Sequence, residues 1–102
     1  MAFSRSSTVV GTSATDLLAT VSGETVVIGL VVANVSSSTD NITVLINNGS
    51  DNFHLIKSAP VPVGSTLSVL DGKVVLGSGD SVKVYAGASA TALEATISVL
   101  TL

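Results

Sequence analysis

Apolar and polar residues alternate with a period of two along most of this chain, and the helical period is almost absent. Alternation of this kind places successive side chains on opposite faces of a β-strand. In residues 81–86 it predicts that Val82 and Val84 point inward. In the C-terminal segment it predicts one buried face, made of Leu93, Ala95, Ile97 and Val99. The pattern therefore predicts a chain built of strands.

Turn signals separate the apolar runs. Asn48-Gly49 and Asp71-Gly72 are typical of tight hairpin turns, in which each glycine would take a positive φ. Gly77–Asp80 predicts a further turn. The strands expected between these signals cover residues 16–21, 25–35, 42–47, 53–59, 66–70, 73–76, 81–86 and 92–102. About eight short strands predict an all-β fold, an antiparallel β-sandwich or jelly roll.

Residues 25–35 stand out because both faces of the predicted strand are apolar. Strict alternation places Val26, Ile28, Leu30 and Val32 on one face and Val27, Val31, Ala33 and Val35 on the other. A strand in a two-layer sandwich normally has one polar face. Either loops or a terminal segment cover the second face, or it meets another subunit or protein. The second alternative makes Val27, Val31 and Val35 candidate interface residues.

We expect one sandwich domain over residues 12–102, preceded by an N-terminal arm over residues 1–11. The arm is rich in serine and also carries the candidate interface residues Phe3, Arg5, Val9 and Val10. An extended arm can lie on a neighbouring protein and become ordered there. The alternative is that these residues form an ordinary first strand.

Composition narrows the classes of partner. The 102 residues are 46% hydrophobic but only 11% charged, with a net charge of −3 and no cysteine. No disulfide is expected, and a negative chain is not expected to bind nucleic acid or an anionic membrane surface. No apolar run is long enough for a membrane span, and the N-terminus lacks the apolar core of a signal peptide. So little charge suggests that partners cover part of the surface.

Candidate chemistry is sparse. His54 is the only histidine, and no second histidine or cysteine completes a zinc set, so we interpret it as a surface or structural residue. Most carboxylates fall in predicted turns, where aspartate caps its own backbone. Asn34, Asn41 and Asn48 match the glycosylation pattern, and we interpret them as turn-forming residues. We expect no catalytic residues, no cofactor and no metal.

The chain resembles a group of small virion proteins of tailed bacteriophages, including phages of cyanobacteria. The similarity spans residues 18–102 and rests on three segments: GLVVANV, then APVPVG, and then LSVLDGKVVLGSGD with ISVL at the end. The chain departs from the family pattern at Ser22-Gly23-Glu24, where the common turn has Pro-Ala before the glycine and lysine after it. The resemblance implies a non-enzymatic structural protein located in the virion, which assembles in the host cytoplasm.

Three functions follow as hypotheses. The first is a capsid decoration (cement) protein that binds the major capsid protein lattice. The second is a tail, neck or fibre component that contacts other virion proteins or the host surface. The third is a sugar-binding or enzymatic jelly roll, which is disfavoured because aromatic residues make up only 3% of the chain. The two-faced apolar strand and low charge also predict a homo-oligomer, with a trimer favoured.

Overall fold

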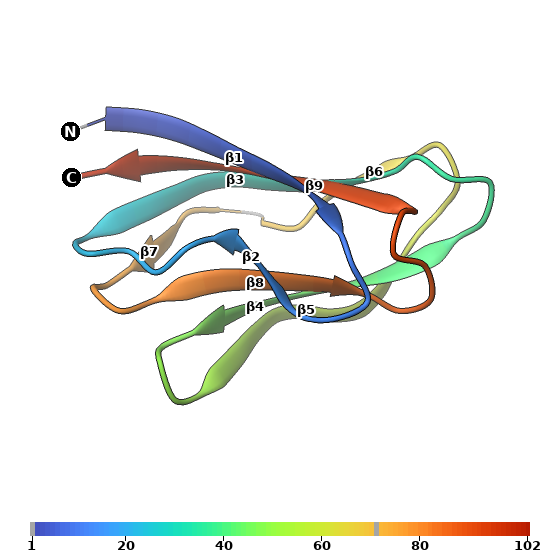
Figure 1. Cartoon of the computed structure of the whole chain (residues 1–102). Helices are drawn as coiled ribbons and strands as arrows, with labels where there is room; N and C mark the ends of the chain where they lie inside the picture. Colours follow the sequence, from blue (N-terminus) through green and yellow to red (C-terminus); the bar gives the residue numbers. More distant parts are fainter. Residues whose placement is uncertain (1, 71) are drawn as a thin grey trace.

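The computed structural model describes residues 2–70 and 72–102 and shows an antiparallel β-sandwich (Figure 1). Within these residues there are nine strands and no helix. The strands are β1 (Ala2–Val10), β2 (Thr15–Leu18), β3 (Thr25–Asn34), β4 (Asp40–Asn47), β5 (Asn52–Val61), β6 (Thr66–Ser68), β7 (Val74–Leu76), β8 (Ser81–Ala86) and β9 (Leu93–Thr101). The all-β prediction is confirmed. No described helix is long and apolar enough to cross a membrane.

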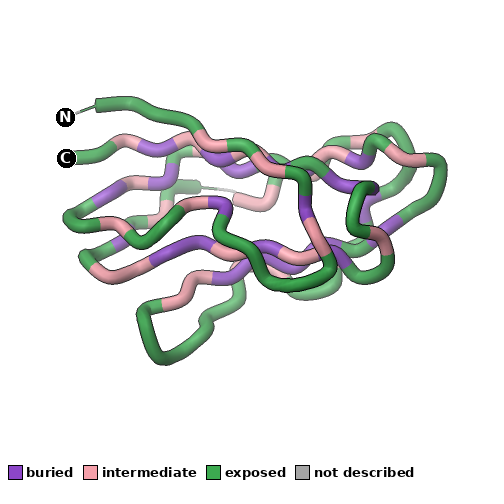
Figure 2. Tube along the Cα trace, viewed as in Figure 1, coloured by how far each residue is buried: buried purple, intermediate pink, exposed green. Residues whose placement is uncertain are grey.

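Two sheets pack face to face. The five-stranded sheet has the order β1-β9-β3-β6, with β7 also paired to β3, and the four-stranded sheet has the order β2-β8-β4-β5. Buried residues alternate with more exposed ones along β8 and β9 (Figure 2), whereas residues 42–45 of β4 are all buried. The predicted inward positions of β8 and β9 are confirmed, because Val82, Val84 and the Leu93–Val99 face are fully or almost fully buried.

A β-bulge in β3 changes which residues of that strand face the core. The register with β9 shifts between Val27 and Gly29, so Ile28 is an extra residue. Thr25 and Val27 point inward before the bulge, and Leu30 and Val32 point inward after it. Val27 is therefore a core residue and is removed from the candidate interface, because the bulge breaks the strict alternation that grouped it with Val31 and Val35.

The N-terminal residues form a strand of the sandwich, so the expectation of a separate arm over residues 1–11 is corrected. Residues 2–10 pair with β9 without any register shift. Val10 is fully buried in the core, and the carbonyl of Gly11 accepts a hydrogen bond from Ala86 N at 2.7 Å. These contacts make the segment part of the fold and remove Val10 from the candidate interface. Met1 lies outside the described residues.

The described strands on either side of the predicted Asp71-Gly72 turn, β6 and β7, do not pair with each other as a hairpin would require. The two short strands β6 and β7 both pair with β3, at Val31–Ala33 and at Thr25–Val27, so they lie in line along one edge. Asp71, the first residue of the predicted turn, lies outside the described residues. In contrast, the turns at Asn48-Gly49 and Gly77–Asp80 are confirmed, with φ of 103° at Gly49 and 95° at Gly79.

Replacement of Gly49 and of Gly72 by valine should have different effects on the free energy of unfolding. Gly49→Val is expected to lower the free energy of unfolding by roughly 1–3 kcal/mol, because a β-branched residue is strained in the left-handed region. Gly72→Val should change it by less than about 0.5 kcal/mol, since a Cβ there meets no atom within 4 Å. Chemical denaturation of both variants measures the difference, and equal losses would contradict the observed turn geometry.

Candidate functional site

The outer face of the five-stranded sheet carries a row of apolar side chains that crosses four strands. Phe3 of β1 pairs with Leu100 of β9, Leu100 pairs with Val26 of β3, and Val26 pairs with Val75 of β7. Residues directly opposite in a sheet project to the same face. Their sequence neighbours Val27 and Val99 are buried in the core, so this row faces away from it. We call Phe3, Leu100, Val26 and Val75 the apolar row.

The apolar row is open at its two ends and partly covered in the middle. Phe3 is 75% exposed and Val75 is 65% exposed, whereas Leu100 and Val26 are half-buried between their neighbours. Ile28, placed at the bulge, and Leu102, which follows β9, are two further exposed apolar side chains near the row. The row lies at the end of the sheet where the two chain termini meet (Figure 1). A contiguous apolar group of this kind is typical of a protein-binding surface.

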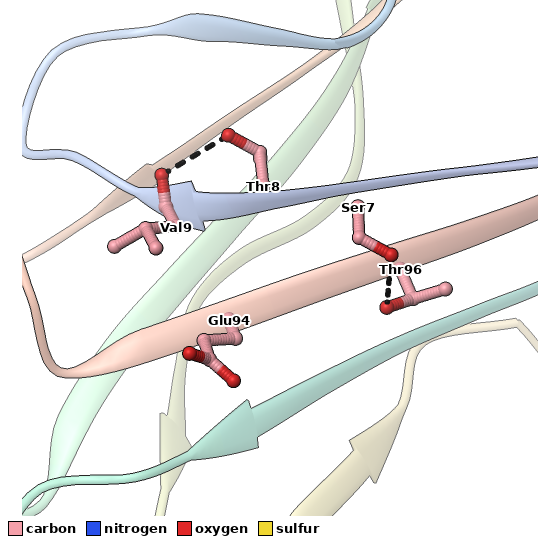
Figure 3. A pocket seen from close by; sticks show the side chains of 5 residues that line it. All are labelled: Ser7, Thr8, Val9, Glu94 and Thr96. Carbon is pink, nitrogen blue, oxygen red and sulfur yellow. Dashed lines mark hydrogen bonds between the residues drawn. The ribbon is translucent and has the colours of Figure 1, made fainter.

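The rest of the outer face is more polar. The next rows place Arg5 beside Ser98, Ser7 beside Thr96 and Val31, and Val9 beside Glu94 and Ala33. The Ser7 and Thr96 hydroxyls lie 2.9 Å apart in a hydrogen bond. They line an open hollow of about 360 Å³ together with Thr8, Val9 and Glu94 (Figure 3). The apolar row is therefore bounded on one side by polar groups.

The structure brings only some of the candidate interface residues together. Phe3 belongs to the apolar row, and Arg5, Val9 and Val31 lie on the same outer face in the polar rows. Val35 is 57% exposed but follows the end of β3. Val10 and Val27 are core residues.

Five residues of this surface were not among the candidate interface residues: Leu100, Val26, Val75, Ile28 and Leu102. Leu100 could have been found, because alternation along β9 places it opposite the buried face that was predicted. The position of Val75 beside Val26 depends on the pairing of β7 with β3, which no local pattern reveals. The change of face between Ile28, which is exposed, and Leu30, which is buried, depends on the bulge.

The buried asparagine at the end of β3 has a structural role. The Asn34 side-chain amide donates to the carbonyls of Ser38 and Val61, each at 2.8 Å. Its carbonyl accepts from the backbone N–H of Ser36 at 2.9 Å. Because Val61 ends β5, this side chain ties the two sheets together at one end of the sandwich. These partners account for a polar residue in the core.

Asp40, the buried acid at the start of β4, holds the loop between β8 and β9. Its carboxylate accepts backbone N–H groups from Asn41 at 2.8 Å, Ala88 at 3.0 Å and Ser89 at 2.9 Å. A hollow of about 260 Å³ lies beside it, between the loops over residues 36–39 and 88–92. The carboxylate is directed to backbone groups and so serves as a loop anchor.

The remaining titratable side chains of the described residues do not form a cluster that could act as a site. His54 is exposed in β5, opposite Leu45, and Asp16 forms an ion pair with Lys83 at 2.7 Å. Among the described residues no three His, Cys, Asp or Glu side chains gather as a metal set would require. Phe53 is 58% exposed near the start of the edge strand β5.

Comparisons with known proteins add no relative. No family model matches the chain, no curated protein matches it, and no solved structure matches it. The candidate site therefore rests on the geometry of the outer face and on the chemistry of its residues.

The two asparagines nearest the β3–β4 connection should respond differently to removal of the amide. Asn34→Ala is expected to lower the free energy of unfolding by about 1–3 kcal/mol, because buried carbonyls lose their donor. Asn41→Ala, at an exposed position, should change it by less than about 0.5 kcal/mol. Thermal and denaturant unfolding of both variants provide the measurement. A stable Asn34→Ala protein would show that this side chain does not tie the sheets.

Proposed function

We propose that the chain is a non-enzymatic structural protein of a tailed-phage virion, and that it decorates the capsid by binding the major capsid protein. The observation that carries the proposal is the apolar row on an open sheet face. Apolar side chains that are aligned across four strands of an exposed face are typical of a surface that binds another protein. A protein that docks on a capsid lattice requires such a surface.

The energetic case rests on the side chains at the open ends of the row. Phe3 and Val75 lose most of their contact with water only when another protein covers them, since each is more than half exposed. Full burial of a side chain of this size contributes roughly 1.5–3 kcal/mol. The polar rows around Arg5, Ser7 and Glu94 then resemble the hydrated rim that surrounds the apolar centre of an interface.

The low charge of the chain supports the same proposal. Only 11% of residues are charged, and the described chain has one ion pair, at Lys83 and Asp16. Surface charge normally keeps copies of a protein from associating non-specifically. A surface with little charge is tolerated in an assembled particle, because partner proteins cover it. The resemblance of residues 18–102 to small phage virion proteins is the reason for proposing that this particle is a phage virion.

Copy number tests the location on the particle. If the chain decorates the capsid, purified virions should contain it in numbers comparable to the major capsid protein, measured by quantitative mass spectrometry with labelled standards. A few copies per virion would assign it to the tail, neck or fibres instead. Its absence from purified virions would refute a structural role in the particle.

The apolar row can be tested by its own variants. Phe3→Ser combined with Val75→Ser should reduce co-sedimentation of the added protein with virions by at least about tenfold, because two exposed anchors are lost. Phe53→Ser is the matched control, since it removes an exposed aromatic side chain that lies outside the row. Melting temperatures confirm that all variants are folded. Equal binding of the double variant and the control would exclude the row as the docking surface.

A further inference from the structure

The sandwich has one long strand edge that lacks the usual protection against pairing. β2 is short and bulged, and β6 and β7 have three residues each. β5 is long but carries two register shifts, Pro60, and Ser58 with a φ of 52°. Edges of these kinds resist the addition of a further strand. β1 has nine residues, no proline and no register shift against β9, so its outer edge can accept a strand.

Hydrogen bonds at both ends of β9 show which groups of β1 point to this edge. Ala92 accepts from Val35 at 2.8 Å, and Leu102 donates to Glu24 at 3.1 Å, so the even-numbered residues of β9 bond to the β3 side. The odd-numbered residues of β9 therefore bond to β1. In the register between the two strands, their partners are Ala2, Ser4, Ser6, Thr8 and Val10. The backbone N–H and C=O groups of Phe3, Arg5, Ser7 and Val9 thus point away from β9.

We propose that β1 pairs antiparallel with β1 of a second copy of the chain, around a two-fold axis at Ser6. This pairing joins the two five-stranded sheets into one continuous sheet. It uses the outward-pointing backbone groups of Phe3, Arg5, Ser7 and Val9. The inference does not depend on the proposed function, because it rests on the edge alone.

The residue order of β1 selects this axis and this partner. With Ser6 opposite Ser6, every residue from Ala2 to Val10 has a partner, and Phe3 lies opposite Val9 of the second copy. Both ends of the strand are apolar and its middle is polar, so the strand is complementary to itself when reversed. An axis at Arg5 would place the two arginines directly opposite each other, which is destabilising. An axis at Ser7 would leave Ala2 and Phe3 beyond the paired strand.

Charge complementarity also favours a second copy. Arg5 of one copy lies opposite Ser7 of the other, beside the hollow formed by Ser7, Val9, Glu94 and Thr96. The row beyond Ser7 contains Glu94, which is exposed on the neighbouring strand β9. The arginine side chain is long enough to bring its guanidinium near that carboxylate across the hollow. Because the dimer has a two-fold axis, this contact occurs twice. In the paired dimer, the Arg5 guanidinium of the second copy would therefore lie in the hollow shown in Figure 3.

Single cysteines test the register, because the chain has none of its own. Ser6 and its copy form a non-hydrogen-bonded pair, whose Cα atoms lie about 4.5 Å apart, a distance that a disulfide can span. In Ser4→Cys, the two thiols would be separated by roughly 13 Å along the strands. In a glutathione buffer, Ser6→Cys should form a covalent dimer at least about tenfold faster than Ser4→Cys. Equal rates, or faster linkage of Ser4→Cys, would overturn the proposed axis.

A proline tests the backbone hydrogen bonds. Ser7→Pro removes an N–H that points to the open edge, whereas Ser7→Ala removes the same hydroxyl and keeps the N–H. Sedimentation of the unmodified chain should show a concentration-dependent species of twice the 10.1 kDa chain mass. Ser7→Pro should weaken this association at least about tenfold, and Ser7→Ala should leave it unchanged.

The masses also separate the proposal from its alternatives. A two-fold edge contact gives a dimer, so a trimer, as expected from the sequence, would overturn it. A folded monomer at all concentrations would overturn it too, and would leave the β1 edge available to a strand of a different protein. If Ser7→Pro fails to fold, the cysteine rates still decide the outcome.

Discussion

The antiparallel pairing of β3 with β9 is the contact on which the rest of the structure depends. β9 also pairs with β1 along its whole length, and β3 also pairs with β6 and β7, so every strand of the larger sheet is attached to one of these two. The inward faces of β3 and β9 supply a large part of the core: Val27, Leu30, Val32, Leu93, Ala95, Ile97 and Val99. Separation of the pair would remove both the sheet and its core.

Among residues 2–70 and 72–102, the core is made of aliphatic side chains. Its fully buried members are valine, leucine, isoleucine and alanine, and the few aromatic residues lie elsewhere. Branched aliphatic side chains have few rotamers and pack well on a pleated surface, which suits a thin sandwich. Two of the buried polar residues, Asn34 and Asp40, hold an end of the sandwich together, whereas Thr43 in the middle of β4 accepts a hydrogen bond from Ser58 N. Asn34 holds β3 to the end of β5, and Asp40 holds the β8–β9 loop.

Two different means of association meet at Phe3. Its side chain begins the apolar row on the sheet face, while its backbone groups point to the open edge of β1. Edge pairing would place Val9 of a second copy beside it and so lengthen the apolar surface rather than cover it. Lateral pairing between copies and docking through the sheet face are therefore compatible, because they use different atoms of the same strand.

The alternation of residues was by itself enough to determine the strand class, most strand positions and the inner faces of β8 and β9, since a regular strand repeats every two residues. The turn at Gly49 followed from local chemistry as well.

Tertiary structure decided the rest. The sequence of residues 2–10 predicts a polar arm, but pairing with β9 makes it a strand. The sequence of β6 and β7 predicts a hairpin, but each strand pairs with β3 instead. The bulge at Ile28 reverses the faces of β3, so Val27 became core while Val26 joined Phe3, Leu100 and Val75. Sheet register joins residues far apart in the chain, and no local pattern contains it.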